Sequence, residues 1–282
     1  MRHKLTVLIP CKNERRNIRP CIDSLRRLAD EILVADSGSS DGTLDIVREM
    51  GGCRIVEREY LDSGNFKNWA IPQAEHSWVL IVDADERVTD PLAAEVSRVL
   101  ADPRCDGYRI GRRNFFLGHE IKHCGWDHDA VLRLFRRDLG RYSDGGDHAE
   151  VGIPSGNVGR VKAKFLHYTY WSLEDYLRKF DRYTTLAAVA WRKQGWPDRF
   201  ASLLLRAPLR FLYLYVIRLG FLDGAAGLVL CMLTAFYSFT KVAKLWALNH
   251  GLPQPDPEAE RKAAGEGRRL DEPSPGSHSA AA

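Results

Sequence analysis

The chain is predicted to be an α/β protein with a mostly parallel sheet flanked by helices. Three short apolar runs, residues 5–9, 31–35 and 78–82, have the length of buried strands, and each ends in a polar segment. The segments 16–28 and 43–50 between them carry apolar residues at helical spacing. Strands that alternate with helices imply a parallel sheet with right-handed crossovers.

The elements follow one another in a regular order. The strand at 5–9 precedes the helix at 16–28, and the strand at 31–35 precedes the helix at 43–50. A weaker strand at 54–57 precedes a helix at 66–74, which leads into the strand at 78–82. The carboxyl ends of parallel strands lie along one edge, where open α/β sheets bind ligands. The polar segments after the strands are therefore predicted to gather there.

Two carboxylates, Asp83 and Asp85, follow the apolar run 78–82 directly. Side chains at i and i+2 share a face in extended chain, so both can offer oxygens to one hard divalent cation. A cation held by so few ligands keeps open positions for substrate phosphates. The alternative is that this Asp-Ala-Asp segment is a helix cap or a polar turn.

Three motifs in order carry a family resemblance. They are Ile9-Pro10-Cys11-Lys12-Asn13-Glu14, Val34-Ala35-Asp36-Ser37-Gly38-Ser39-Ser40-Asp41-Gly42-Thr43 and Asp83-Ala84-Asp85-Glu86-Arg87. This order and spacing resemble the signature of family 2 glycosyltransferases of the GT-A fold. Three finer segments, 67–70, 132–137 and 221–224, are similar to a bacterial branch that adds a sugar, often glucose, to the lipopolysaccharide inner core or to related glycolipids. The resemblance covers residues 4–249.

The resemblance implies a site for a nucleotide-sugar donor at the strand ends. Its expected residues are Pro10, Asn13, Glu14, Asp36, Ser37, Asp41, Lys67, Asp83 and Ala84. Asp36 is expected to accept hydrogen bonds from the ribose or the uracil edge, and Ser37 stands where many relatives carry a second acid. Lys67 offers a compact charge to a phosphate, or it is a solvent-facing lysine. Asp41 fits the donor pocket and also a turn that opens a helix.

The reaction that the resemblance implies is inverting transfer. An acceptor hydroxyl attacks the anomeric carbon from the face opposite the departing nucleotide diphosphate. Mg²⁺ or Mn²⁺ would neutralise the charge that develops on the leaving group. Its expected ligands are Asp85, Asp83 and His148, with Asp85 as the direct ligand, and Asp83 contacts the donor sugar or ribose in the alternative arrangement. Relatives commonly carry a His-Glu pair here, whereas Ala149 follows His148 in this chain.

The attacking hydroxyl also needs a general base within hydrogen-bonding distance. Asp129 matches an aspartate that recurs in this branch before the Leu-Arg-Leu-Phe-Arg segment, so it ranks first, followed by Asp127 and then Asp147. Each carboxylate can instead form an ion pair with a nearby arginine. The alternative for His119, His123, Cys124 and His128 is a zinc site, although their spacing fits no standard ligand pattern.

The chain is predicted to divide into a catalytic domain at 1–165, a helical region at 166–250 that binds the acceptor and the membrane, and a disordered tail at 251–282. The apolar runs 211–217 and 225–239 are bordered by basic residues. A spanning helix needs about 20 mostly apolar residues, and neither run reaches that length without a charged residue, Gly or Pro. They are expected to lie on the membrane surface, and a soluble helical hairpin is the alternative. The tail lacks large apolar residues.

Charge and cysteines narrow the class of protein. The formal net charge of +4 is too mild to predict nucleic-acid binding. The six cysteines are scattered, and no secretory signal is seen at the start, so reduced thiols in the cytoplasm are expected. The expected location is the inner face of the bacterial cytoplasmic membrane.

The predicted function is transfer of a hexose, with glucose as the first choice, from a UDP-sugar to a lipid-linked saccharide of the lipopolysaccharide inner core or to a related glycolipid. A second reading changes the acceptor to polyprenyl phosphate or a polysaccharide precursor. A third is a non-catalytic nucleotide-binding scaffold at the membrane surface. The carboxylates of Asp36, Asp83 and Asp85 argue against the scaffold, since a scaffold needs no aligned carboxylates.

Overall fold

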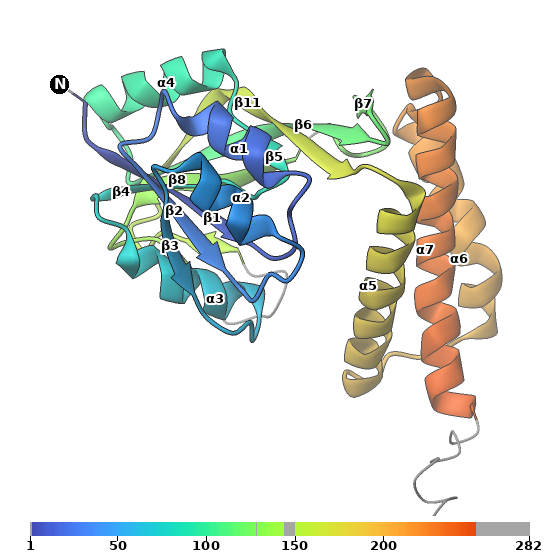
Figure 1. Ribbon diagram of the computed structural model, residues 1–282. Coiled ribbons are helices and arrows are strands. Elements are labelled where there is room, and N and C mark those ends of the chain that lie inside the picture. The colour runs from blue at the N-terminus through green and yellow to red at the C-terminus, as the bar shows by residue number, and fades with distance from the viewer. Residues whose placement is uncertain (1, 128, 144–149, 252–282) are drawn as a thin grey trace, which may run out of the picture.

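The computed structural model describes residues 2–127, 129–143 and 150–251, which form a large mixed sheet with a helical appendage beside it (Figure 1). The strand order is β3-β2-β1-β4-β8-β6-β11-β5, and β7 pairs with β6. The strands are β1 (Leu5–Cys11), β2 (Glu31–Asp36), β3 (Arg54–Glu57), β4 (Trp78–Ile81), β5 (Glu86–Arg87), β6 (Gly107–Phe116), β7 (His119–Ile121), β8 (Ala130–Arg136) and β11 (Val158–Tyr170), with a separate pair of β9 (Arg141–Tyr142) and β10 (Val151–Gly152).

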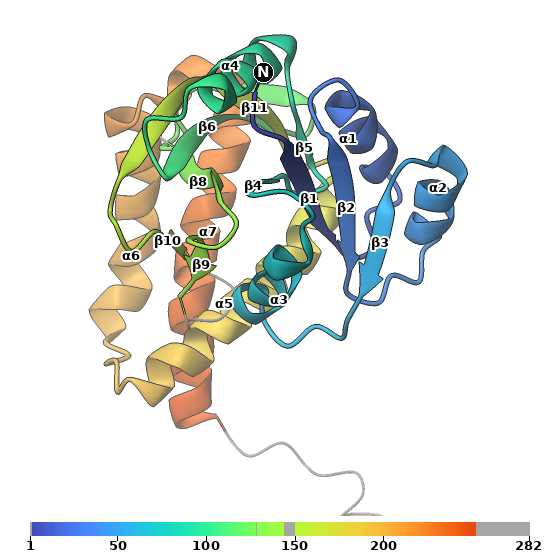
Figure 2. The same ribbon diagram turned by 90° about the vertical axis from the view of Figure 1, so that its left-hand side faces the viewer.

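The half of the sheet formed by β3, β2, β1 and β4 is parallel, as predicted. The helices packed around the sheet are α1 (Ile18–Leu25), α2 (Thr43–Met50), α3 (Ser63–Ala70), the short 3-10 helix η1 (Ile71–Gln73) and α4 (Asp90–Ala101). Alternate side chains of β1 point to opposite faces. Val7 and Ile9 pack with α1 and α4, whereas Leu8 packs with α3. Figure 2 shows α1 and α3 on opposite sides of β1.

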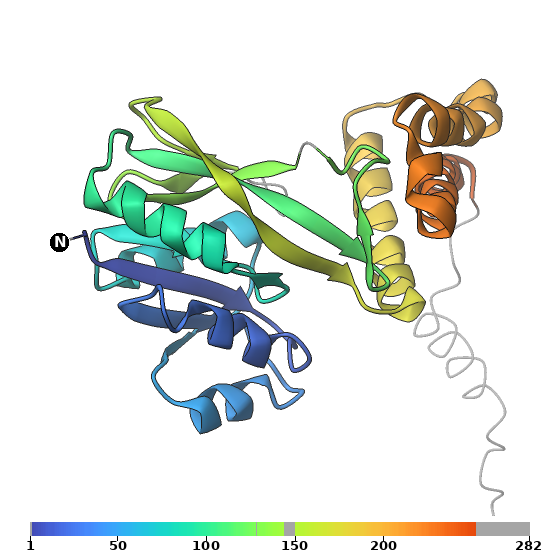
Figure 3. The same ribbon diagram turned by 90° about the horizontal axis from the view of Figure 1, so that it is seen from above.

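The other half of the sheet is antiparallel around β8, which pairs with β4 on one side and β6 on the other. β11 returns parallel to β6 with register shifts, and the two strands extend beyond the rest of the sheet toward the appendage (Figure 3). The predicted boundary between residues 165 and 166 falls inside β11. The first helix of the appendage begins at Leu173.

The appendage consists of α5 (Leu173–Lys193), α6 (Phe200–Leu212), the π-helical turn η3 (Tyr213–Ile217), the 3-10 turn η4 (Gly220–Asp223) and α7 (Gly224–His250). Phe180, Leu214 and Leu230 bury their side chains together with Phe116 of β6, so one apolar cluster joins the appendage to the sheet. The predicted tail lies outside the described residues, apart from Gly251.

Two helical stretches of the appendage are long and apolar enough to cross a membrane, by length and composition alone. They are Phe200–Ile217 and Gly220–His250, with mean hydropathies of 1.5 and 1.6. The helices are therefore longer than the apolar runs 211–217 and 225–239, and their position on the membrane surface stays a prediction. The sequence pattern treated charged residues and glycine as interruptions, whereas the helices continue through them.

Asp223 fastens the appendage to the loop after β7. Its carboxylate accepts hydrogen bonds from the backbone N–H groups of Lys122 and His123, at 3.2 and 2.9 Å, and pairs with Nδ1 of His123 at 2.9 Å. Close backbone approach in the same place needs glycine, because a Cβ on Gly227 would lie 2.1 Å from the carbonyl oxygen of Gly220. The segment 221–224 of the sequence motif thus has a structural role.

Replacing Asp223 with alanine should destabilise the protein by about 1–3 kcal/mol, because two backbone donors at the junction lose their acceptor. Thermal unfolding measures this change. Asp181→Ala is the control, since it removes an exposed carboxylate from the same appendage and should change stability by less than about 0.5 kcal/mol. Equal melting temperatures for Asp223→Ala and the wild type would contradict the assigned role.

Candidate active site

A cavity of about 560 Å³ lies at the carboxyl ends of β1, β2 and β4. It brings together seven residues that were predicted from the sequence to contact the donor or the metal: Pro10, Glu14, Ser37, Lys67, Asp83, Ala84 and Asp85. Its opposite wall comes from the appendage, where α5 supplies Lys179, Arg182 and Tyr183. We call it the donor cavity after that prediction, and its walls come from both the sheet and the helices.

A larger cleft of about 850 Å³ shares Glu14 and Asp85 with the donor cavity, and it is also lined by Asn13 and Asp41. Asn13 adopts a left-handed φ of 56°, and its side chain accepts from the backbone N–H of Ser40 at 2.8 Å. Asp41 accepts from the backbone N–H of Thr43 at 3.0 Å at the start of α2. The contacts of Asp41 are thus those predicted for a turn that opens a helix. Its position at the cleft is also compatible with donor binding.

Asp36 is fully buried behind the wall of the donor cavity. One carboxylate oxygen accepts from the backbone N–H groups of Gly38 and Ser39, each at 2.8 Å. The other oxygen accepts from the Ser39 hydroxyl and the Cys11 thiol. Asp36 therefore holds the loop after β2 in shape, and a contact with the donor stays a prediction.

Asp83 is held by cations. Its carboxylate pairs with the buried guanidinium of Arg133 and lies 3.7 Å from Nζ of Lys67. Burial acts to raise the pKa of Asp83, but the charges of Arg133, Lys67 and Arg112 outweigh it and keep the pKa below its usual range. Asp83 is consequently ionised, and the cationic side chains around it balance its negative charge.

Asp85 has fewer protein partners and faces both the donor cavity and the cleft. Nε2 of His167 lies 3.6 Å from its carboxylate. Burial acts to raise the pKa of Asp85, and the hydrogen bond and charge of His167 outweigh it, so the pKa lies below its usual value. Asp85 therefore presents a negative charge to any ligand in the cavity.

The residues present fit a divalent cation whose coordination is completed by substrate oxygens. Across residues 2–127, 129–143 and 150–251, no three His, Cys, Asp or Glu side chains are grouped to hold a metal ion. Mg²⁺ and Mn²⁺ commonly bind through one or two carboxylates plus substrate phosphates. Asp85 suits this arrangement, whereas the cations around Asp83 compete with a metal for its oxygens.

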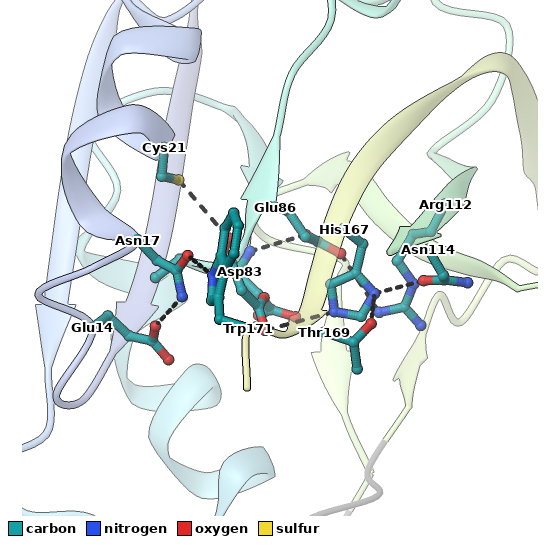
Figure 4. Close-up of polar contacts among 12 residues, drawn as sticks. Glu14, Asn17, Cys21, Asp83, Glu86, Arg112, Asn114, His167, Thr169 and Trp171 are labelled. Atoms are coloured by element: carbon teal, nitrogen blue, oxygen red, sulfur yellow. Dashed lines mark hydrogen bonds and ion pairs between the residues drawn. The ribbon is translucent and has the colours of Figure 1, made fainter. Parts of the chain in front are cut away.

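Asp129 is linked to Asp85 through the side chains of Asn114 and His167. Its carboxylate pairs with the guanidinium of Arg112 at 2.6 Å and accepts from the Asn114 amide at 3.4 Å. Asn114 in turn contacts Nδ1 of His167 at 2.7 Å (Figure 4), and Nε2 of His167 lies 3.6 Å from the Asp85 carboxylate. Asp129 lines a cavity of about 330 Å³ whose wall also includes His167. A side chain of the donor cavity thus separates the candidate base from the candidate metal ligand.

The other two candidate bases differ in position. The Asp127 carboxylate pairs with the guanidinium of Arg218 at 2.7 Å, at the junction with the appendage. Asp147 lies outside the described residues, as do the candidate ligands His128 and His148. His123 and Cys124 of the alternative zinc cluster contact Asp223 instead.

Burial raises the pKa of Glu14 to about 7; the hydrogen bond from Asn17 opposes this shift, and the charge of Asp85 adds to it. Asn17 lies 2.8 Å from the carboxylate of Glu14 and also accepts from the Trp171 indole at 2.8 Å. Near neutral pH, the protonated form of Glu14 can therefore donate a hydrogen bond to an oxygen atom of a ligand in the cavity.

Comparison with known proteins identifies the family of this chain. The family described as "Glycosyl transferase family 2" matches residues 6–152. The chain is also 31% identical over 248 residues to the "Lipopolysaccharide core biosynthesis glycosyltransferase LpsC" of Rhizobium meliloti (strain 1021), which covers 86% of this chain and 92% of that protein. The chain belongs to glycosyl transferase family 2. The predicted family and the predicted GT-A type of fold are confirmed.

Other relatives of this family 2 glycosyltransferase are more distant. The "Uncharacterized glycosyltransferase RT0209" of Rickettsia typhi is 26% identical over 259 residues, 87% of this chain and 88% of that protein. Among solved structures, glucosyl-3-phosphoglycerate synthase from Mycobacterium tuberculosis, in complex with Mn²⁺, UDP and glucosyl-3-phosphoglycerate, has a TM-score of 0.48 and 20% identity over 69% of this chain and 81% of that chain.

The family 2 site contains residues that sequence reasoning left without a role. They are Glu86, Arg112, Asn114, Arg133 and His167. Glu86 and Arg133 stand within motifs that carried the resemblance, and their burial follows from their strand positions. Arg112, Asn114 and His167 lie on β6 and β11, whose pairing brings them together. No local pattern announces that pairing.

Proposed function

We propose that this family 2 glycosyltransferase moves a hexose, with glucose as the first candidate, from a UDP-sugar to a lipid-linked saccharide of the lipopolysaccharide inner core. The observation that carries the proposal is the position of Asp85, an ionised carboxylate with few partners at the meeting point of the donor cavity and the cleft. The likeness over most of the chain to a lipopolysaccharide core glycosyltransferase supports the acceptor class.

Residues around the donor cavity suit the parts of a nucleotide sugar. Pro10, Glu14 and Ser37 come from the strand ends and suit the nucleoside, with Asn13 and Asp41 at the adjoining cleft. Lys179 and Arg182 reach the same cavity from α5 and suit the diphosphate charge. These groups would bind and orient the donor while the buried sheet keeps the strand ends fixed.

In the proposed reaction, Asp129 takes the proton of the acceptor hydroxyl as that oxygen bonds to the anomeric carbon. The bond between the anomeric carbon and the diphosphate oxygen breaks on the opposite face, and its electron pair leaves with UDP. Arg112 and Asn114 hold the Asp129 carboxylate in place. When bound, Mg²⁺ or Mn²⁺ on Asp85 would stabilise negative charge on the leaving group.

A second acceptor, polyprenyl phosphate, is favoured by one observation. The helical stretch Gly220–His250 has the length and hydropathy to cross a membrane, which suits an enzyme whose acceptor is anchored in the bilayer by a polyprenyl chain and presents its phosphate at the surface. Peripheral attachment at the inner face of the cytoplasmic membrane remains our proposal, since the appendage carries basic residues among its apolar ones.

The direct test is a transfer screen with the purified full chain. UDP-glucose, UDP-galactose, UDP-N-acetylglucosamine and GDP-mannose are each supplied with and without Mn²⁺, with truncated lipopolysaccharide or polyprenyl phosphate as acceptor. The expected result is Mn²⁺-dependent transfer of glucose from UDP-glucose to the truncated lipopolysaccharide. Transfer from GDP-mannose alone would overturn the donor assignment, and transfer only to polyprenyl phosphate would favour the second acceptor.

A further inference from the structure

A cavity of about 550 Å³ lies on the appendage between α6, η3 and α7, apart from the donor cavity. Three cationic side chains line it: Arg206 and Arg210 from α6 and Lys241 from α7. The spacing of Arg206 and Arg210 places both on one face of α6. Thr234, Ser238 and Lys241 recur at helical spacing along one stripe of α7. The packing of α6 beside α7 brings these two faces together (Figure 1).

The three cations have no acidic partner among residues 2–127, 129–143 and 150–251. They rest on aromatic rings instead: Arg206 lies 4.8 Å and Lys241 lies 5.0 Å from the centre of the Trp191 ring. Lys244, one turn further along α7, contrasts with them because it pairs with the Asp181 carboxylate at 2.7 Å. Gathering like charges without a counterion is unfavourable, so an anion in the cavity would stabilise the arrangement.

The surface around the cavity is apolar. Leu209 and Tyr213 line the cavity and are 60% and 43% exposed. Leu205, Leu212 and Phe236 on the same helices are exposed as well. A ligand that meets this surface would carry an anionic group and hydrocarbon in one molecule. That combination distinguishes a lipid from a free phosphate or a soluble sugar phosphate.

We propose that this cavity binds the phosphate headgroup of an anionic membrane lipid, with Arg206, Arg210 and Lys241 around the phosphate and the acyl chains over Leu209 and Tyr213. Arginine forks match phosphate oxygens in pairs, and the lysine adds a point charge. The proposal goes beyond sugar transfer, because it assigns a separate lipid site to the appendage and involves no group of the donor cavity.

Calorimetric titration of the full chain with dihexanoylphosphatidylglycerol, kept below its critical micelle concentration, tests the proposal. We expect one lipid per chain. Arg206→Gln/Lys241→Gln should weaken that binding at least about tenfold. The matched control is Lys193→Gln/Arg199→Gln, which removes the same charge from exposed positions of the appendage. It should bind within about twofold of the wild type, because solvent screens distant charges.

A second variant, Ser238→Phe, keeps every charge and fills the cavity, so it should also lose lipid binding. Circular dichroism and UDP-glucose hydrolysis report whether each variant is folded, and we expect hydrolysis to be unchanged. If the wild-type protein hydrolyses UDP-glucose but binds no lipid, this proposal is overturned and the proposed function still stands.

Three results would overturn the lipid assignment. The first is inorganic phosphate or glycerol phosphate binding as tightly as the lipid. The second is equal loss of binding in the double variant and its charge-matched control, which would indicate general attraction instead of a site. The third is wild-type protein that binds no lipid at all.

Discussion

An Asp85→Asn variant is expected to lose sugar transfer by at least about a thousandfold at saturating donor and Mn²⁺, while unfolding at the wild-type temperature. The substitution keeps the shape of the side chain and removes the negative charge that faces the donor cavity. Charge stabilisation of a leaving group by a bound metal amounts to several kcal/mol, and each 1.4 kcal/mol is about tenfold in rate. Turnover with the best donor from the screen is the measurement.

Two comparison variants sharpen this test. Asp83→Asn leaves the buried guanidinium of Arg133 without its nearest carboxylate, so it should lower stability by about 1–3 kcal/mol in addition to any loss of activity. Asp23→Asn removes an exposed carboxylate from α1 and should change neither property. Wild-type turnover by Asp85→Asn at saturating Mn²⁺ would refute the metal assignment.

The second large effect is expected for Asp129→Asn, which should lower turnover by about 10²–10⁴-fold and change UDP binding by less than about threefold. Asparagine keeps a hydrogen-bonding oxygen for Arg112 and cannot take up the acceptor proton. Asp129 lines the neighbouring cavity rather than the donor cavity, so donor affinity should be spared. Single-turnover rates and calorimetric UDP titration separate the two effects.

Asp127→Asn is the informative partner for that variant. Its carboxylate pairs with Arg218 at the junction, so the variant should lose little turnover. A larger loss in Asp127→Asn than in Asp129→Asn would move the base to Asp127. Wild-type turnover in both variants would leave Asp147 as the remaining candidate.

The parallel half of the fold was predictable because its signals are local. The strand at 54–57 and the helix at 43–50 match β3 and α2 in their bounds. The antiparallel half was not predictable, because its long strands β6, β8 and β11 show no clear local pattern. Charged residues such as Arg109 and Arg133 inside these strands obscure the hydrophobic alternation.

The site residues likewise fall into a group that was predictable from local motifs and a group that was not. Residues that follow the parallel strands, such as Glu14 and Asp85, were located from their motifs and lie at the donor cavity. The chain of contacts from Asp129 through Asn114 to His167 depends on strand pairing, so the sequence predicted its first member alone. Asp36 shows a further limit: its position was predicted, but its contacts with the loop at Gly38 and Ser39 were not.

One helix serves two sites. α5 carries Lys179 at the donor cavity and Trp191 beside the cationic cavity of the appendage, and twelve helical residues place them about 18 Å apart along a stiff rod. A chain cut before this helix would retain the core of its sheet but lose one side of the pocket. A membrane surface that binds the end of α5 near Trp191 would therefore also set the orientation of the donor cavity relative to that surface.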